Sequence, residues 1–498
     1  MSEKKEVAMD IDSDQLLTER TQSGFKVKKI YGPEDVKDID YDRDIGTSGS
    51  VPYTRGKYKD MYRGRLWTKQ KTIGFQSGEK TCERIRWQIE KGITSVRIVP
   101  DALNMGGVDA DHPLVKDTLG HGGPPRYAMH ILEEELKGVS LLGGLFEFNA
   151  AIAPWNDVCI YCMFIGIAEK RGIDLAKLRG AMVNDPIHTY GFEMCVWQPF
   201  EMAWKLTVDS MEFAAKHTPL WHSVCPCGYD MRETGVDVVQ ELALVLAERI
   251  AYIDAVMERG VAFEDIAPRI PLAFSGEIDF FEQICKLRAA RRMWTKIANE
   301  RYGITDPHAL RASCNIKTAG SSMTAQQPIY NVIRLTIEAL SGVLGGVNSI
   351  ELSGFDEALA LPSKDAEMIN MGIHNIIAHE TGAPLVTDPL GGSYYVEWFT
   401  SEIEKEAFEY LRKIDEIGGV VKAFQKGWIQ EEVRKAILKR QEELDKKERV
   451  LVGVNAFEEL ADEEVPVRLY EYQNQEARSE RPLHECIEFK NTQTIQRV

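Results

Sequence analysis

Short apolar runs alternate with longer amphipathic stretches along the chain between Gly92 and Pro389. Each run is brief, and such runs are candidates for buried strands. The runs recur at roughly forty-residue intervals, which leaves room for a helix between consecutive strands. The eight runs occupy residues 93–101, 138–149, 178–185, 222–230, 269–277, 309–316, 347–357 and 383–389.

The stretch after the fourth run shows the helical pattern clearly. Asp237 is the expected N-terminal cap and Gly260 the expected end of the helix. Apolar residues that recur every three or four positions share one helix face. They are Leu242, Leu246, Ile250, Ile253 and Met257. Eight strand–helix units in succession predict an α/β fold, a closed (β/α)8 TIM barrel.

In such barrels the active site lies at the C-terminal ends of the strands. The residues that close or follow the runs are therefore the first candidates for a site, and acids dominate them. These residues are Asp101, Glu147, Asn184, Asp185, Asp230, Ser275, Asn315, Glu357 and Asp388.

The two ends of the chain have different patterns. Residues 1–52 are polar, with clusters of Gly, Asp and Ser, and predict an extended N-terminal arm. The barrel is expected over residues 53–400. Residues 401–498 carry mixed charges in a helical pattern and predict a solvated C-terminal helical subdomain and tail. The apolar side chains expected to face the barrel there are Phe408, Leu411 and Ile414.

The composition narrows the class of protein. Of the 498 residues, 44% are apolar and 28% are charged, as in a globular protein. The net charge of −17 argues against a nucleic-acid partner, because phosphate binding needs a basic face. No apolar run is long enough to span a membrane, and the polar start does not have the pattern of a secretory signal. A cytoplasmic protein is expected.

The nine cysteines are odd in number and sparse, so a disulfide framework is not expected. Two pairs have short spacings, Cys159 with Cys162 and Cys225 with Cys227. No second pair with metal-ligand spacing accompanies the first, which lies in a helical pattern. We expect packed free thiols and no metal site.

Eight longer motifs follow one another along the chain: YTRGKYKDMYRGRLWT (Tyr53–Thr68), GVDADHP (Gly107–Pro113), GYDMRETG (Gly228–Gly235), DIAPRI (Asp265–Ile270), KLRAARRMW (Lys286–Trp294), SSMTAQQPIYNVIRLTIEALSGVLGG (Ser321–Gly346), GFDEALALP (Gly354–Pro362) and TDPLGGSYYVE (Thr387–Glu397). Together they resemble the catalytic chain of methylmalonyl-CoA mutase and its relatives, among them the isobutyryl-CoA and 2-hydroxyisobutyryl-CoA mutases. The resemblance covers residues 50–455 in the same order.

This resemblance implies a barrel threaded by the CoA part of an acyl-CoA, with adenosylcobalamin against the C-terminal mouth. In the family the cofactor supplies the radical chemistry and the protein positions it. By residue matching, Glu357 would hold the adenosyl ribose, and Tyr229, Glu233 and Met105 would contact the cobalamin.

The residues that match the CoA path of the family lie mainly in the first motif. Arginines along that path would bind the phosphates of CoA. The matching residues are Tyr58, Met61, Arg65, Thr68 and Arg269.

A partner is implied as well. The family motif Asp-x-His-x-x-Gly, whose histidine binds cobalt, is absent, and DPIHTYG (Asp185–Gly191) is one residue too long to match it. About thirty residues follow Val465, too few for the Rossmann-like domain that carries the motif. The resemblance therefore implies a separate small cobalamin-binding subunit and a hetero-oligomer, without nucleic acid or membrane as partners.

The chain departs from the family where the substrate and the adenosyl group would meet. Asp230 stands where relatives have a histidine for the thioester carbonyl, and Glu193 where methylmalonyl-CoA mutase has an arginine for the migrating carboxylate. Thr72 replaces a tyrosine beside the adenosyl group, and Val183 replaces a glutamine near the thioester. A carboxylate at Glu193 would repel a carboxylated substrate, which argues against methylmalonyl-CoA.

Further substitutions relative to the family do not identify the acyl group of the substrate. Val99 replaces the aspartate that reads the hydroxyl group in the 2-hydroxyisobutyryl enzyme. One interpretation of the added acids is family drift, with solvent-facing tips or compensating lysines. Another is a pocket for a cationic acyl group, formed by Asp230, Glu193 and Glu147. A protonated Asp230 would restore the missing donor. Two other positions lose small hydroxyl residues, Asp60 and Leu145.

These expectations predict the catalytic subunit of an adenosylcobalamin-dependent acyl-CoA carbon-skeleton mutase that acts on a short acyl-CoA other than methylmalonyl-CoA. Two alternatives stay open. One is a non-catalytic or repurposed paralogue, which the missing histidine favours. The other is a cobalamin-independent barrel lyase with Asp230 and Glu357 as acid and base.

Overall fold

The computed structural model describes residues 19–101, 111–113, 123–142, 144–148, 154–192, 198–458 and 467–470. Its centre is a curled sheet of seven parallel strands in the order β4-β3-β2-β1-β7-β6-β5. The strands are β1 (Thr68–Ile73), β2 (Ser95–Ile98), β3 (Leu145–Phe148), β4 (Gly180–Met182), β5 (Leu272–Gly276), β6 (Cys314–Thr318) and β7 (Ser349–Glu351). The prediction of an α/β fold around a parallel sheet is confirmed.

Residues 222–227 lie against both edges of this sheet. His222 forms a parallel bridge with Ala181 of β4, and Cys227 forms one with β5. Pro226 has no N–H to donate, so a continuous ladder cannot pass through it. The strand expected here is therefore present only as isolated bridges, and the sheet itself has seven strands and is not a closed barrel.

Two strand predictions are corrected by the structure. Strand β1 (Thr68–Ile73) was not among the predicted runs, because its sequence TKQKTI is polar and two of its polar residues, Gln70 and Lys71, are buried in the interior. The predicted run 383–389 contains a short 3-10 helix, η8 (Ala383–Leu385), and no strand. The strands β2 to β7 each overlap a predicted run.

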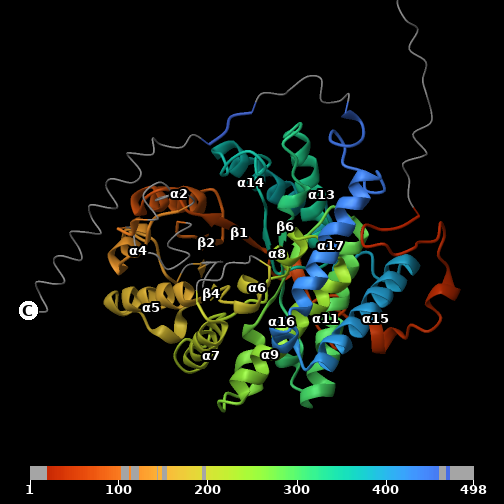
Figure 1. Cartoon of the computed structure of the whole chain (residues 1–498), viewed down its shortest axis with the longest axis horizontal. Helices are drawn as coiled ribbons and strands as arrows, with labels where there is room; N and C mark the ends of the chain where they lie inside the picture. Colours follow the sequence, from red (N-terminus) through yellow and green to blue (C-terminus); the bar gives the residue numbers. More distant parts are fainter. Residues whose placement is uncertain are drawn as a thin grey trace, which may run out of the picture.

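Helices cover the outer face of the sheet (Figure 1). The predicted helix is α9 (Val238–Met257), and the carboxylate of Asp237 accepts the N–H groups of Val239 and Gln240 at its start. The apolar face expected for it is buried, except that Met257 is partly exposed. The other helices are α1 (Met61–Gly64), α2 (Gly78–Glu90), α4 (Met129–Glu135), α5 (Pro154–Lys170), α6 (Pro186–Gly191), α7 (Phe200–His217), α8 (Gly228–Glu233), α10 (Phe263–Ile266), α11 (Phe280–Tyr302), α12 (Pro307–Leu310), α13 (Tyr330–Leu344), α14 (Lys364–His379), α15 (Tyr394–Ile417), α16 (Val420–Gln425) and α17 (Trp428–Asp445).

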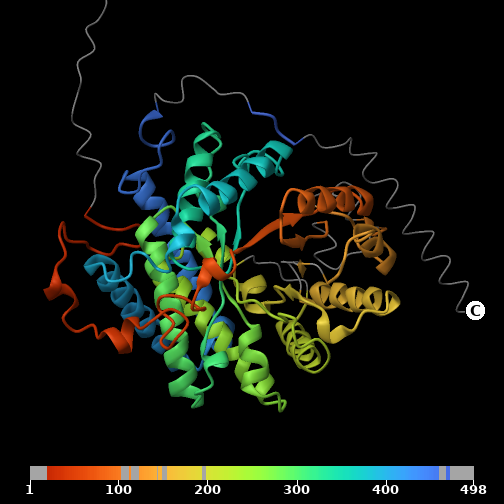
Figure 2. The same ribbon diagram turned by 180° about the vertical axis from the view of Figure 1, so that it is seen from behind.

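The described part of the N-terminal segment lies along α15, as Figure 2 shows for the red end of the chain. The ring centroids of Phe25 and Phe399 are 5.2 Å apart. The hydroxyl of Ser23 donates to Glu282 of α11 at 2.7 Å. These contacts attach the segment to the helices instead of to the sheet.

The C-terminal helices pack on the helices around the sheet. Helix α15 runs without interruption through position 400 and contacts α9 and α11. Leu411 and Ile414 are buried, and Phe408 packs against the same core. The division of the chain at residue 400 remains a prediction.

Every cysteine in the described residues is free. Cys225 is buried and Cys227 half-buried, but Cys159 and Cys162 are exposed on α5, so the prediction that these two thiols are packed is wrong. Among the described helices, none has the length and apolar character needed to cross a lipid bilayer.

Candidate active site

A cavity of about 600 Å³ lies at the N-terminal ends of the strands and extends inward along them. Gln70 of β1 and Asn315 of β6 line its inner part. All the residues predicted to contact CoA line this one cavity; they are Tyr58, Met61, Arg65, Thr68 and Arg269. The structure thus brings together residues from distant parts of the sequence.

Cations surround the cavity. Four of them lie shortly before a strand, so the sheet gathers their side chains at one end, and Lys57 lies before α1. In the described residues, no carboxylate lies within ion-pair distance of any of them. These cations are Lys57, Arg65, Arg179, Arg269 and Arg311.

Burial and neighbouring cations lower the pKa of two groups in this cavity. Burial, together with the nearby Arg311, lowers the pKa of Lys57 to about 7. Burial also lowers the pKa of His222 to about 4, so this ring is neutral near pH 7. Neighbouring cations contribute to both shifts, and the same positive charges attract an anion.

A buried ion-pair network lies deeper in the interior. Arg97 of β2 pairs through Nε with Oε1 of Glu147 at 2.6 Å and through Nη1 with Oε2 of Glu351 at 2.8 Å. Glu147 also accepts a hydrogen bond from Gln70 at 2.5 Å. The carboxylate of Glu147 is therefore neutralised within the protein, and this removes one of the three acids from the predicted pocket for a cationic group.

The predicted residue Thr72 belongs to the same network. Its N–H donates to Oε1 of Glu351 at 3.0 Å, and its hydroxyl bonds to the same oxygen. Val183, the other small replacement, is buried, and its carbonyl accepts the N–H of Cys225 at 3.0 Å. Thr72 and Val183 lie beyond the inner part of the cavity, at the C-terminal ends of β1 and β4.

Three predicted cofactor residues surround one glycine at the C-terminal mouth. The N–H of Gly320 donates to the hydroxyl of Tyr229 at 3.3 Å, and the N–H of Ser321 donates to Glu233 at 2.7 Å. A Cβ atom on Gly320 would lie 2.9 Å from the Tyr229 hydroxyl, 3.4 Å from the Glu233 carboxylate and 3.8 Å from Cγ of Glu357. The mouth therefore depends on the absence of a side chain at this position.

One carboxyl group at the mouth has a raised pKa. Burial and the nearby Glu277 raise the pKa of Glu233 to about 7. Burial raises the pKa of the Tyr229 hydroxyl, which stays protonated. The half-buried Glu357 accepts the N–H of Gly354 at 3.2 Å through Oε2.

Asp230 is paired with a histidine that the sequence did not point to. Nε2 of His188 lies 2.6 Å from Oδ2 of Asp230, and the His188 side chain is 1% exposed whereas that of Asp230 is 31% exposed. Burial alone would raise the pKa of Asp230, but His188 and Lys317 outweigh it and hold the pKa below its ordinary value. The hypothesis of a protonated Asp230 therefore finds no support.

The pair has a definite structural origin. Helix α6 follows β4, and the carboxylate of Asp185 caps it by accepting the N–H of Ile187 and of His188, each at 3.1 Å. This cap orients the helix so that His188 faces the start of α8, which carries Asp230.

Cys227 lies beside the same pair, and its thiol donates to Asp230 at 3.5 Å. The ligand atoms of His188, Cys227 and Asp230 lie within 4.8 Å of one another. These residue types bind zinc. The direct hydrogen bond between His188 and Asp230, and the charge of Lys317 nearby, favour a proton-sharing pair over a metal site.

Two predicted site residues, Glu193 and Met105, lie outside the described residues. Val99 follows β2, and its carbonyl accepts a hydrogen bond from Arg126 at 3.2 Å. Asp60 is exposed near the outer cavity.

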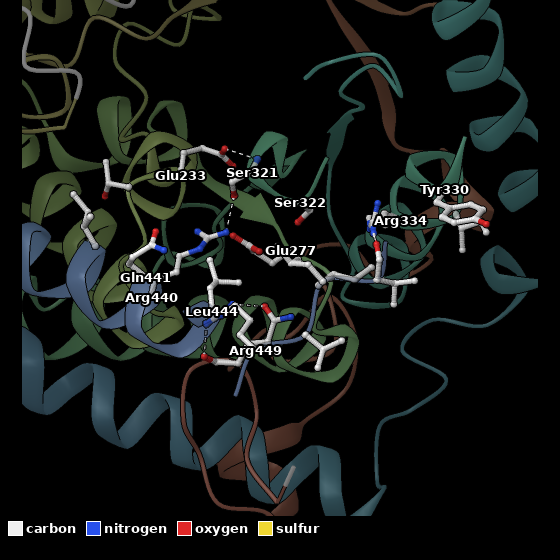
Figure 3. A pocket seen from close by; sticks show the side chains of 18 residues that line it. Glu233, Glu277, Ser321, Ser322, Tyr330, Arg334, Arg440, Gln441, Leu444 and Arg449 are labelled. Carbon is white, nitrogen blue, oxygen red and sulfur yellow. Dashed lines mark hydrogen bonds between the residues drawn. The ribbon is translucent and has the colours of Figure 1, made fainter. Parts of the chain in front are cut away.

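A second cavity, of about 790 Å³, adjoins the mouth (Figure 3). Glu233 and Ser321 lie on its wall, and Arg440 of α17 donates to the hydroxyl of Ser321 at 3.1 Å. Arg334 of α13 lines the far side in Figure 3. The predicted cofactor residue Glu233 therefore faces an open space beside the mouth.

The sequence reasoning missed two residues of the mouth, His188 and Lys317. His188 was considered only as part of a failed cobalt-binding motif. Lys317 is two positions after Asn315, a predicted strand-end residue, and the two-residue period of a strand places both side chains on one face. That period is the signal that could have found Lys317.

Comparison with known proteins identifies a family model and several relatives. A family model described as methylmalonyl-CoA mutase matches residues 20–498. The 2-hydroxyisobutanoyl-CoA mutase large subunit of Aquincola tertiaricarbonis is 34% identical over 454 residues, which cover 91% of this chain and 80% of that protein. The methylmalonyl-CoA mutase of Rhizobium meliloti is 32% identical over 461 residues, covering 92% of this chain and 63% of that protein. Human mitochondrial methylmalonyl-CoA mutase is 30% identical over 440 residues, covering 88% and 58%.

This chain spans less than two thirds of the length of these two methylmalonyl-CoA mutases. The family model nevertheless matches nearly all of the chain, and the Aquincola relative matches 91% of it. The chain belongs to the methylmalonyl-CoA mutase family.

Proposed function

We propose that this chain is the catalytic subunit of an adenosylcobalamin-dependent mutase that rearranges the carbon skeleton of a short acyl-CoA. The observation that carries the proposal is the ring of cations without carboxylate partners around the N-terminal cavity. In a chain with a net charge of −17, such a concentration of positive charge indicates an anionic ligand. The diphosphate and the 3′-phosphate of CoA supply that charge.

The path of the substrate follows from the strands. Residues 222–227 are proposed to complete an eight-stranded barrel, since they bridge both edge strands. The interior then connects the cationic cavity with the C-terminal mouth. Arg269 and Arg311 hold the phosphates, and Gln70 and Asn315 line the path of the pantetheine arm.

The mouth residues fit a cofactor that carries hydroxyl groups. Glu357 uses one carboxylate oxygen for the N–H of Gly354, and the half-buried side chain is available to accept from a ribose hydroxyl. Tyr229 and Glu233 frame the bare Gly320, where a side chain would fill the space. Adenosylcobalamin, when bound, supplies the radical that starts the rearrangement. Met105 is proposed to belong to the same surface.

The acyl end of the substrate is proposed to meet Thr72, Val183 and Asp230. Asp230 is ionised and paired with His188, so it acts as an acceptor for a hydroxyl or N–H group and does not donate to a carbonyl. Glu193 is proposed to disfavour a carboxylated acyl group. A separate cobalamin-binding subunit is proposed to cover the mouth and exclude water, as the name large subunit of the Aquincola relative suggests.

The direct test is turnover by the assembled enzyme. The purified chain, the cobalamin-binding subunit that co-purifies with it and adenosylcobalamin are offered isobutyryl-, methylmalonyl-, 2-hydroxyisobutyryl- and 3-aminobutyryl-CoA. Isomers are followed by chromatography with mass detection. We expect isomerisation of an acyl-CoA without a free carboxylate. Binding of adenosylcobalamin without any isomerisation would favour a non-catalytic paralogue, and activity without the cofactor would favour a lyase.

The pKa of Lys57 predicts how CoA binding depends on pH. This ammonium group is charged below pH 7 and neutral above it, because burial lowers its pKa to about 7. The 3′-phosphate of CoA keeps its full charge above its second pKa, near 6. The Kd for CoA is therefore expected to rise roughly five- to ten-fold from pH 7 to pH 9. Calorimetry checks this, and Lys57→Met is expected to remove the dependence.

Gly320→Ala tests the cofactor surface. The added Cβ would lie 2.9 Å from the Tyr229 hydroxyl, so the ring has to move. Overpacking of this kind is expected to raise the Kd for adenosylcobalamin roughly ten-fold in the assembled enzyme. Gly372→Ala on α14 is the matched control, because nothing lies within 4 Å of the added atom. Equal cofactor affinity in both variants would contradict the proposed surface.

A further inference from the structure

Lys317 has no part in the function proposed above, yet it lies in the middle of the mouth. It belongs to β6, and the side chains of Asn315 and Lys317 share one face of that strand. Asn315 lines the CoA cavity, so Lys317 continues the same wall toward the C-terminal end. Its backbone pairs in register with Glu351 of β7 and Ser275 of β5.

The ammonium group of Lys317 has no direct carboxylate partner in the described residues. Its Nζ lies 4.2 Å from the centroid of the Tyr229 ring, a cation–π contact. Burial lowers the pKa of Lys317, but Tyr229, Glu351, Glu357 and Asp230 outweigh this and raise it above its ordinary value. Lys317 therefore carries its charge throughout the physiological range.

The carboxylates around Lys317 are bonded elsewhere. Asp230 is paired with His188, and Glu351 with Arg97. Glu357 accepts the N–H of Gly354. Their negative potential keeps the lysine charged, but in the described residues none of their oxygens lies within ion-pair distance of its Nζ. The three N–H donors of the ammonium group remain available for an acceptor that is not part of the protein.

We propose that Lys317 binds an sp² oxygen of the acyl group, either the thioester carbonyl or an acyl carboxylate. The inference rests on the proposed function, because it needs an acyl-CoA in the interior. Asp230 is an acceptor and cannot donate to such an oxygen, and His188 is buried behind it with Nε2 bonded to Asp230. Lys317 is then the cationic donor at the acyl end, and its charge polarises the carbonyl that it contacts.

A purely structural role for Lys317 leads to a different expected effect of its loss. If Lys317 only positioned Tyr229 and balanced the acids, its loss would change folding and all ligands alike. If it binds an acyl oxygen, its loss would weaken only those ligands that carry that oxygen. The comparison of ligands with and without the carbonyl therefore separates the two roles.

The test measures Kd by calorimetry for free CoA, isobutyryl-CoA, succinyl-CoA and S-isobutyl-CoA, a thioether without the carbonyl. The wild-type chain is expected to bind isobutyryl-CoA about ten-fold tighter than the thioether, because a charge-assisted hydrogen bond is lost. Lys317→Met is expected to bring this ratio to about one with an unchanged Kd for free CoA. Lys317→Arg is expected to retain part of it.

Controls make the result decisive. Lys69→Met, a half-buried residue of β1 that bonds to Asn375 and does not line the cavity, is expected to leave every ratio unchanged, and thermal unfolding checks that all variants are folded. A greater loss for succinyl-CoA than for isobutyryl-CoA in Lys317→Met identifies a carboxylate, and an equal loss identifies the thioester carbonyl. A ratio that persists in Lys317→Met, or a wild type that binds neither isobutyryl-CoA nor succinyl-CoA tighter than the thioether, overturns the inference alone. No binding of free CoA to the wild type overturns the proposed function as well.

Discussion

Arg97→Met is expected to lower the free energy of unfolding by about 3–5 kcal/mol, because it removes the guanidinium that pairs directly with two buried carboxylates. Arg97 bridges Glu147 and Glu351, whose side chains are 8% and 2% exposed. Gln70 and Thr72 satisfy only part of the remaining hydrogen-bonding capacity. Urea unfolding at pH 7 measures the change.

The pH dependence of this loss has a definite sign. In the wild type burial would raise the pKa of Glu351, but Arg97 and Lys317 hold it below the ordinary value. Without Arg97 the folded-state pKa rises above the unfolded one, so the destabilisation grows as the pH rises from about 4.5 and shrinks in acid. Arg412→Met, in an exposed pair, is expected to leave stability nearly unchanged. A loss in Arg97→Met that is independent of pH would contradict an electrostatic cause.

The double variant Arg269→Ala/Arg311→Ala is expected to raise the Kd for CoA at least about 100-fold, because each guanidinium contributes charge-assisted hydrogen bonds to phosphate. Both side chains line the cationic cavity and lack carboxylate partners in the described residues. Burial and the neighbouring Arg179 lower the pKa of Arg269, a sign that its charge is not compensated. The variant should therefore unfold at the same temperature as the wild type or at a higher one.

Calorimetry in low and high salt checks this result. Added salt is expected to weaken CoA binding to the wild type more than to the double variant. Arg63→Ala is the matched control, since this exposed arginine lies on α1 and does not line the cavity. A parallel loss of CoA binding and of stability would mean that the arginines are structural.

The periodicity of the sequence predicted most of the fold because most strands carry buried apolar residues on at least one face. It failed at β1, where the interior is charged and the strand reads as polar. It failed again at residues 383–389, where Leu385 and Val386 are apolar but exposed, in a connection between helices. A hydrophobic pattern predicts a strand only where buried residues are apolar and exposed residues are polar. In β1 polar residues are buried, and in residues 383–389 apolar residues are exposed.

The site was predictable only in part, and through the resemblance. It indicated Glu357, Tyr229 and Glu233, and the structure places them around Gly320, although their roles remain proposals. The pairing of Asp230 with His188 was not visible, because it joins helices 42 residues apart in sequence. Such a partner follows only from the positions of β4 and α6 in space.

The place of β1 in the sheet has a consequence for synthesis of the chain. This strand pairs with β2 on one side and with β7 on the other, and β7 begins at Ser349. At 5–20 residues per second, a ribosome needs roughly 15–60 s to reach β7 after it has made β1. During that interval one edge of β1 has no strand to bind. Fragments that end before Ser349 are therefore expected to aggregate, and expression trials of shortened chains should keep β7.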